Sequence, residues 1–273
     1  MPPALFLVGL VALGVVVGAY GTLIGAGGGF ILVPVLLLLY PHASPAQVTA
    51  ISLGVVFANA ASGSVGYYRL RRVDYRTGII LGAATLPGAI LGALVVDRIQ
   101  RQAFDLTMGF ALLIIAAFLF FRPSGALSLG GDMRFAVTRR LVDAQGVGYI
   151  YRFNLALAAA FSVAVGFVSS LLGIGGGILH VPLLTSLFAF PAHIATATSH
   201  FVLMGMAAAA TITHIVHGDY TGSVVVTLAL AVGVVVGAQA GAALSRRVGG
   251  RLILRLLAVG LGLVGVRLLL LRG

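Results

Sequence analysis

Long apolar runs alternate with short polar segments along the whole chain. An α-helix needs about 20 apolar residues to cross the roughly 30 Å hydrocarbon core of a bilayer, and the runs reach that length. A polar stretch at 122–152 divides them into two sets of four. The pattern therefore predicts an all-α polytopic membrane protein. The apolar runs lie at about 4–40, 46–68, 77–97, 103–121, 153–190, 194–216, 222–244 and 252–271.

Composition supports a chain surrounded by the lipid bilayer. Hydrophobic residues make up 60% of the 273 residues and charged residues only 8%, whereas about 25% of a soluble domain is charged. The net charge of +11 comes from arginines that lie mainly between the apolar runs. This placement indicates membrane topology and not a nucleic-acid partner. No cysteine is present, so disulfides and thiolate chemistry are excluded.

A glycine-rich motif occurs twice, once in each set of apolar runs. Residues 25–34 read GAGGGFILVP and residues 173–182 read GIGGGILHVP, so both follow the pattern G-x-G-G-G-x-x-x-V-P. Further matches in the same order argue against chance similarity. The sequence predicts two homologous membrane repeats, 1–121 and 153–273, joined by 122–152. The further matches pair Asp74-Tyr75 with Asp219-Tyr220, Thr77-Gly78 with Thr221-Gly222, and Gly88 and Gly92 with Gly237 and Gly241.

Two of the apolar runs, 4–40 and 153–190, are too long for one straight crossing. At 1.5 Å per residue each would form a helix of about 55 Å, far beyond the bilayer thickness. Each run holds the glycine cluster near its middle, and glycine is a poor helix former. We therefore expect a helix, a break and a second helix of about 12–15 residues in each run. Each half then contains one such broken helix and three further transmembrane helices.

The arginines bear on topology. If each broken run crosses the membrane once, the two halves are parallel; if each goes in and comes back, the second half is inverted. The second arrangement divides the arginines more unevenly, so the positive-inside rule favours inverted repeats. Segments 69–76, 122–152 and 245–255 would then face the cytoplasm, and both termini would lie outside. Within the connecting segment 122–152, residues of about 132–145 are expected to form an amphipathic surface helix or, equally, a plain linker.

The glycine breaks predict an anion site. A break inside the membrane exposes N–H groups at the start of the second helix, where the positive end of the helix dipole lies. Such a helix start binds anions without a charged side chain. Two breaks related by symmetry would form a two-sided cradle. The alternative is that the glycines only allow close helix packing, which suits Gly88, Gly92, Gly237 and Gly241. The cradle residues would be Gly27, Gly28 and Gly29 with Gly175, Gly176 and Gly177.

Polar side chains in the apolar runs are candidates for further contacts with the anion. Ser52 and Ser199 occupy similar places after the two motifs, and a hydroxyl there can donate to an oxyanion. The alternative is that they bond to carbonyls of their own helix. Asn59 and His200 are further candidate ligands. Because histidine exchanges protons near physiological pH, His180 and His200 are candidates for coupling transport to protons.

Two acidic residues and two histidines near the ends of apolar runs allow more than one interpretation. Asp74 and Asp219 are expected to cap helix N-termini, with a role in gating as the alternative. His214 and His217, together with Asp219, raise the possibility of a metal site, but the pattern is weak and no metal is predicted. No cofactor is predicted either.

Taken together, the doubled motif with its Val-Pro ending, the roughly eight hydrophobic segments and the arginine-bearing connection after the second segment resemble the sulfite exporter TauE/SafE family. The resemblance covers nearly the whole chain. It implies a multi-pass protein of the bacterial cytoplasmic membrane. It also implies transport of small sulfur-containing anions such as sulfite, sulfoacetate or related organosulfonates. The residues themselves indicate only a small anion.

The most favoured function is a secondary transporter of a small anion, with protons as a candidate coupling ion. An anion channel is the alternative, because channels also use dipole-lined sites. An intramembrane enzyme is disfavoured: adjacent Ser199 and His200 point to different helix faces, and the chain has no glutamate for a metalloprotease motif. A structural membrane subunit would leave the repeated glycine breaks unexplained. The sequence leaves the oligomeric state open.

Overall fold

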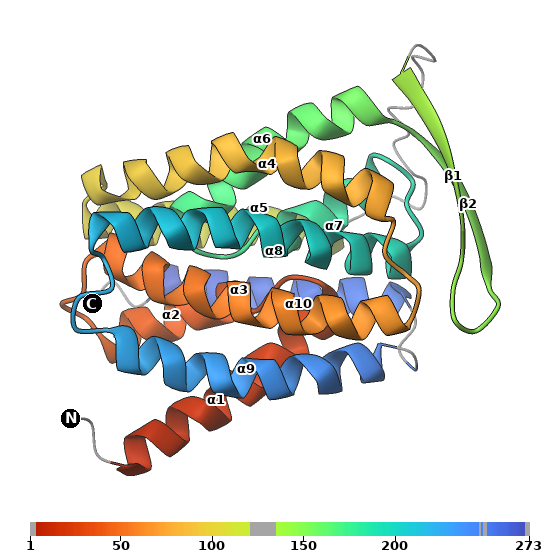
Figure 1. Ribbon diagram of the computed structural model, residues 1–273. Helices are drawn as coiled ribbons and strands as arrows, with labels where there is room; N and C mark the ends of the chain where they lie inside the picture. The colour runs from red at the N-terminus through yellow and green to blue at the C-terminus, as the bar shows by residue number, and fades with distance from the viewer. Residues whose placement is uncertain (1–3, 121–134, 246, 248–249, 271–273) are drawn as a thin grey trace.

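The computed structural model describes residues 4–120, 135–245, 247 and 250–270. Its described part is a bundle of α-helices with one β-hairpin (Figure 1). Six of these helices, α1, α3, α4, α6, α8 and α9, are long and apolar enough to cross a membrane, which confirms the polytopic all-α prediction. The elements are α1 Ala4–Ile24, α2 Gly29–Leu39, α3 Pro45–Arg69, α4 Tyr75–Val95, the short 3-10 helix η1 Val96–Arg98, α5 Arg101–Phe120, β1 Ala136–Val142, β2 Gly148–Asn154, α6 Leu155–Leu172, α7 Gly177–Ser186, α8 Ala192–His217, α9 Val224–Leu244 and α10 Gly250–Leu270.

Both long apolar runs break at their glycines, as predicted. The first break separates α1 from α2, and the second separates α6 from α7. The second helices, with 11 and 10 residues, are slightly shorter than expected. Left-handed backbone, which glycine adopts at little cost, makes both breaks. Positive φ angles occur at Gly25, Gly27 and Gly28 in the first break and at Gly173 and Gly175 in the second.

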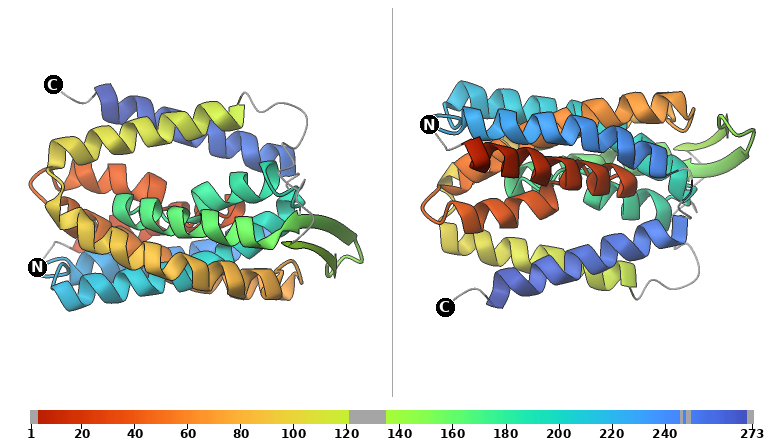
Figure 2. Two further views of the ribbon diagram at one scale, coloured as in Figure 1. Left: turned by 90° about the horizontal axis from the view of Figure 1, so that it is seen from above. Right: turned by 90° about the horizontal axis from the view of Figure 1, so that it is seen from below.

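The two halves run in opposite directions through the bundle (Figures 1 and 2). Helix α1 starts at the end that carries both termini, and α2 turns back towards that end. Helix α6 starts at the opposite end, beside the hairpin, and α7 turns back towards the hairpin. Hydrogen bonds also place the end of α2 beside the start of α5, because Arg101 donates to the carbonyls of Leu37 and Ala43. An inverted repeat requires this arrangement, and the inverted relation itself stays a prediction.

Close packing of α1 on α9 and of α4 on α6 depends on glycine. A Cβ atom at Gly88 would overlap the Val163 carbonyl oxygen, and one at Gly237 would overlap the Val15 carbonyl oxygen. Gly92 and Gly241 lie equally close to carbonyls of the facing helices. The packing interpretation of these glycines is therefore confirmed, since small residues let helix backbones approach closely.

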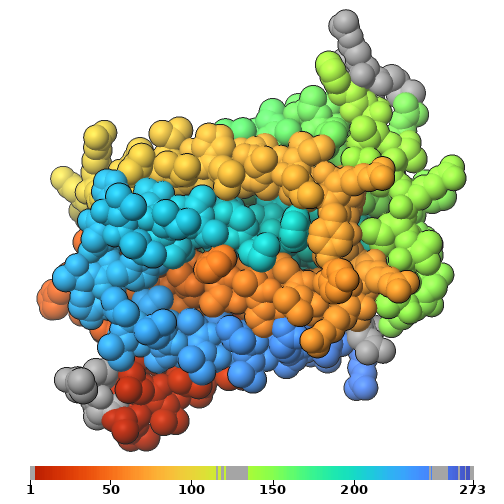
Figure 3. All heavy atoms as spheres, viewed as in Figure 1, coloured from red at the N-terminus to blue at the C-terminus, as the bar shows by residue number. Residues whose placement is uncertain are grey.

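The connecting segment forms a β-hairpin, so the expected surface helix or plain linker was wrong for residues 135–145; residues 132–134 lie outside the described residues. Strands β1 and β2 pair antiparallel. Tyr151 and Phe153 are buried against Phe190, and the hairpin covers the end of the bundle near the start of α4 (Figure 3). On β2 the aromatic residues Tyr149, Tyr151 and Phe153 point inward at every second position, which is typical of a half-buried strand.

A buried ion pair attaches the hairpin turn to the helices. The guanidinium of Arg72, between α3 and α4, donates from Nε to the Asp143 carboxylate at 3.2 Å and from Nη2 to Gln145 at 3.1 Å. Burial alone would raise the pKa of Asp143, but bonds from the N–H groups of Val147 and Gln145 and the charge of Arg72 together hold that pKa below its ordinary value. The Asp143 carboxylate thus anchors the turn of the hairpin.

Asp74 anchors the base of the hairpin. It caps α4, as predicted, by accepting a bond from the Thr77 N–H at 3.1 Å. The same carboxylate accepts a bond from the Tyr151 hydroxyl at 2.9 Å and lies 3.5 Å from the Arg139 guanidinium. The Asp74 N–H donates to Thr198 on α8. One residue therefore connects the hairpin with α4 and α8.

Replacing Asp143 by asparagine should loosen the hairpin by about 1.5–3 kcal/mol, because a charge-assisted bond to buried Arg72 is lost. In the wild type, a lowered pKa means that this contribution is complete above the ordinary aspartate pKa of about 3.9 and is lost as the pH falls through the lowered value. Amide hydrogen exchange across β1 and β2 measures the effect. Arg152→Gln, at an exposed strand position, is the control, and equal exchange in both variants contradicts the anchoring role.

Candidate functional site

The two glycine breaks contact each other in the centre of the bundle. A Cβ atom at Gly29 would lie 2.7 Å from the carbonyl oxygens of Gly173 and Ile174, and one at Gly177 would overlap the Gly25 carbonyl oxygen. All residues of both breaks are buried. The structure therefore brings together the two sets of glycines that the sequence singled out.

Helices α3 and α8 enclose this contact in matching ways. Val56 of α3 and Leu203 of α8 each lie against both Gly27 and Gly175. At the outer sides of the contact, Thr196 of α8 lies against Gly25, as Thr49 of α3 lies against Gly173. Each half thus supplies one break and one enclosing helix.

The starts of α2 and α7 lack side-chain caps. Gly28 and Gly176 are their N-cap residues, and neither can supply a capping oxygen. Each helix start instead faces carbonyl oxygens of the other break, through the contacts of Gly29 and Gly177. The carbonyl oxygens of each break therefore lie close to the positive dipole end of the other break's helix.

Asn59 of α3 holds the first break in place. Its Nδ2 group donates to the Gly27 carbonyl at 2.9 Å, and its Oδ1 atom accepts a bond from the Thr22 hydroxyl at 3.0 Å. The Tyr67 hydroxyl in turn donates to the Thr22 carbonyl at 2.5 Å. These three side chains are buried. The predicted candidate Asn59 therefore contacts the break directly through a neutral hydrogen-bond network.

The two candidate histidines lie beside different breaks. His200 Nε2 is 3.4 Å from both the Thr22 hydroxyl and the Asn59 carbonyl, next to the first break. His180 Nε2 is 2.9 Å from the Ser162 hydroxyl, and its ring lies next to Gly176 in the second break. Both rings are fully buried. Neither ring has a carboxylate among its hydrogen-bond partners in the described part of the chain.

The candidate serines differ in their bonding. The Ser52 hydroxyl donates to the Gly173 carbonyl of the second break at 2.6 Å, and not to its own helix. Ser199 is buried, and its hydroxyl has no hydrogen-bond partner among the described residues. Ser52 is thus committed to holding the second break, while Ser199 retains a donor for a ligand.

Ser52→Ala should destabilise the protein by about 1–3 kcal/mol, because it leaves the buried Gly173 carbonyl unpaired. Ser199→Ala removes no bond and should change stability much less, which makes it the matched control. Thermal unfolding of both variants in detergent measures the difference. Equal destabilisation would show that the bond across the halves contributes nothing.

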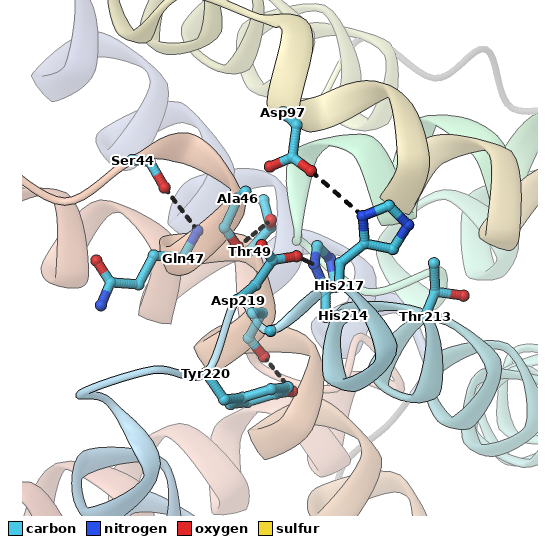
Figure 4. Close-up of polar contacts among 12 residues, drawn as sticks. Ser44, Ala46, Gln47, Thr49, Asp97, Thr213, His214, His217, Asp219 and Tyr220 are labelled. Atoms are coloured by element: carbon cyan, nitrogen blue, oxygen red, sulfur yellow. Dashed lines mark hydrogen bonds and ion pairs between the residues drawn. The ribbon is translucent and has the colours of Figure 1, made fainter.

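At the end of the bundle that carries the termini, histidine and aspartate side chains form two pairs (Figure 4). His214 Nδ1 lies 2.7 Å from Asp219, and His217 Nδ1 lies 3.8 Å from Asp97. The expected N-cap role of Asp219 was wrong, because Ser223 occupies the N-cap position of α9. Within the described residues, no group of three or more such side chains is arranged to hold a metal ion.

Sequence reasoning missed Tyr67, Thr49 and Thr196 as parts of the site. All three lie in apolar helices, where a polar side chain is a signal of a specific contact. Thr49 and Thr196 also occupy equivalent places in α3 and α8, which a closer comparison of the two halves would have shown. The glycines that these two threonines contact lie in the opposite half, so their partners depend on how the two halves are aligned against each other.

Comparison with known proteins assigns the chain. A sequence model of the sulfite exporter TauE/SafE family matches residues 10–268. The probable membrane transporter protein YunE of Bacillus subtilis is 30% identical over 270 residues, which cover 95% of this chain and 96% of that protein. The probable membrane transporter protein MJ0441 of Methanocaldococcus jannaschii is 24% identical over 274 residues, which cover 96% and 94%. No solved structure matches the chain significantly.

These matches extend across both breaks and both sets of helices. The relatives are named as transporters, and the described helices are long and apolar enough for several crossings of the cell membrane. The chain belongs to the sulfite exporter TauE/SafE family of membrane transporters.

Proposed function

We propose that this transporter moves a small anion, sulfite or an organosulfonate, and binds it near the membrane midplane between the two glycine breaks. The observation that carries the proposal is that two helix starts without side-chain caps, those of α2 and α7, each lie against the other glycine break. Helix starts favour anions through their free N–H groups and dipoles. The description of the family supplies the sulfur chemistry of the substrate.

Neutral donors would complete the site. Ser199 and His200 lie on α8 and Asn59 lies on α3, whereas the Ser52 hydroxyl of α3 already donates to the Gly173 carbonyl. Because these side chains are uncharged donors or acceptors, the substrate charge would be met by backbone dipoles. This keeps an arginine or lysine out of the apolar core, where a charged side chain is costly.

Inverted repeats would give such a site access to each side in turn. The two halves, 1–121 and 153–273, each supply one break, so relative movement of the halves would separate the carbonyl contacts at Gly29 and Gly177. The hairpin end would face the cytoplasm, as the arginine distribution favours. The observed closed contact then corresponds to a state between the two openings.

Arginines at the hairpin end support the handling of anions on that side. A surface cavity of about 590 Å³ is lined by Arg76, Arg139 and Arg140 together with Asp74 and Tyr151. Asp74 is already engaged by Arg139 and Tyr151. The remaining positive charge would raise the local concentration of anions at this mouth.

Counterflow in proteoliposomes tests the proposal. Liposomes loaded with unlabelled sulfite should accumulate radiolabelled sulfite transiently, because a carrier exchanges its substrate across the membrane. The same experiment with sulfoacetate and with chloride separates sulfur anions from a general anion preference. An anion channel shows saturation-free flux without counterflow. Absence of both signals for all three anions contradicts the proposed function.

A further inference from the structure

The end of the bundle that carries the termini contains a polar cluster outside the glycine breaks (Figure 4). It lies where α8 ends at His217 and the chain continues to α9, and Asp97 of η1 lies beside His217. His214 is fully buried, while the Asp219 side chain is 14% exposed. Asp219 thus connects a buried imidazole to the surface.

The hydrogen bond to Asp219 defines the chemistry of His214. Its Nδ1 atom lies 2.7 Å from the carboxylate, so Nδ1–H donates to Asp219 and the lone pair of the neutral ring lies on Nε2. His214 Nε2 is buried and has no hydrogen-bond partner in the described part of the protein. A buried nitrogen without a partner is costly, and one that holds a lone pair accepts a proton.

The surroundings compensate an added positive charge. Asp219 is in contact, and Asp97 of η1 lies 3.8 Å from the neighbouring His217. The last carbonyls of α8 add the negative end of its dipole. Burial raises the pKa of Tyr220, in the loop after Asp219, to about 12, so its hydroxyl stays neutral.

Cations on the adjacent elements are occupied or exposed. From α5, Arg101 is bound to Asp105 and to carbonyls at the end of α2 and before α3. From η1, Arg98 is exposed. On the α3 side, Ser44, Gln47 and Thr49 contribute no titratable group (Figure 4). The cluster therefore holds two carboxylates facing two histidines.

The second half differs from the first at this position. His214 lies as far after Thr196 in α8 as Tyr67 lies after Thr49 in α3, and the two threonines contact the breaks in matching ways. Tyr67 reaches the Thr22 carbonyl just before the first break. His214 occupies the same position of α8 in sequence, so an exchangeable group stands where the first half has a neutral phenol.

We propose that His214 Nε2 is the site that binds the coupled proton, with Asp219 as the residue that positions the ring and balances its charge. A proton from water at this end adds to the Nε2 lone pair, forms an N–H bond and makes the ring an imidazolium. In the reverse step the N–H bond breaks, and the proton returns from Nε2 to water. Buried His180 and His200 lack such a carboxylate, and an uncompensated charge is costly in the core. The coupling role rests on the proposed function.

Nuclear magnetic resonance tests proton binding without any substrate. Protein labelled with ¹³C at histidine Cε1 and placed in lipid nanodiscs is titrated between about pH 5 and about pH 8, where histidine exchanges protons. One titrating signal should vanish in His214→Gln. In Asp219→Asn its midpoint should move to lower pH, because the anionic partner is gone. A His214 signal that stays constant over this range overturns the proposal.

Transport separates this proposal from the proposed function. Radiolabelled sulfite uptake is measured in proteoliposomes with and without a pH gradient. His214→Gln should retain sulfite exchange without the gradient, but the stimulation of uptake by the gradient should be at least about tenfold smaller than in the wild type. The variant His42→Gln, at an exposed position, should keep the full stimulation. Stimulation that survives in His214→Gln contradicts the coupling role. If the wild type transports no anion, the proposed function fails, while the titration still decides whether His214 binds a proton.

Discussion

Gly177→Ala is expected to prevent the protein from reaching its folded state. The added Cβ atom would overlap the Gly25 carbonyl oxygen and lie 2.8 Å from the Ala26 Cα atom. Both are backbone atoms of the other break, so neither can move aside as a flexible side chain would. The destabilisation should exceed the roughly 1–3 kcal/mol of ordinary overpacking. The yield of monodisperse protein in detergent and its thermal unfolding measure the effect.

Gly205→Ala is the matched control for this substitution. Gly205 lies inside α8, and a Cβ atom there would meet nothing within 4 Å. Alanine is favoured over glycine in a helix by about 1 kcal/mol, so this variant should be as stable as the wild type or more stable. A stable Gly177→Ala protein would show that the two breaks do not pack in the observed way.

The second large effect is expected for Asn59→Leu. Leucine fills a similar volume but leaves the buried Gly27 carbonyl and the Thr22 hydroxyl without the bonds that Asn59 makes. An unpaired buried carbonyl at Gly27 costs about 1–3 kcal/mol, and the Thr22 hydroxyl keeps only its 3.4 Å contact with His200, so the free energy of unfolding should fall by about 1–3 kcal/mol or more. Thermal unfolding in detergent measures the loss.

A substitution far from the breaks controls for the loss of an amide in a helix contact. Gln239 of α9 donates to the Ser62 carbonyl at 2.6 Å, and it is only partly buried. Gln239→Leu should therefore cost less than Asn59→Leu. If the two variants unfold at the same temperature, the Asn59 network has no special role in holding the first break.

The helices and their breaks could be predicted from sequence because both follow from local rules. A run such as 4–40 is too long for one crossing, and several consecutive glycines determine where it breaks. Helices α2 and α7 return towards the ends where α1 and α6 begin. This is the arrangement that the uneven distribution of arginines between the two sides favoured. These features need no knowledge of contacts between distant residues.

The hairpin and the partners of the polar residues could not be predicted in the same way. Val137 and Leu141 of β1 pack on the cluster of buried residues that contains Phe190, a surface that only the folded chain supplies. Asp219 resembles Asp74 in sequence, yet the nearby histidine redirects its carboxylate to His214. Ser52 bonds across the halves to Gly173, a contact set by the register between the two breaks.

The choice of substitution decides how cleanly the anion site can be tested. Gly28 has a φ of 82°, and its Cβ would lie 2.8 Å from the Val17 carbonyl oxygen, so a larger residue there disturbs folding itself. Gly176 has an ordinary helical φ of −62°. Its Cβ would meet the Met206 sulfur at 2.9 Å, and methionine adapts readily. Gly176→Ala should therefore fold while it places a methyl group at the start of α7.

The most direct measurement of the central claim is the thermal stabilisation of wild type and Gly176→Ala by sulfite and sulfoacetate, with chloride as the reference. A ligand at about 100 times its dissociation constant stabilises the folded wild type by about 2.7 kcal/mol. The account predicts this shift for a sulfur anion in the wild type and in Gly205→Ala, and its loss in Gly176→Ala. An equal shift in Gly176→Ala, or no shift in the wild type, would contradict binding of the anion at the paired breaks.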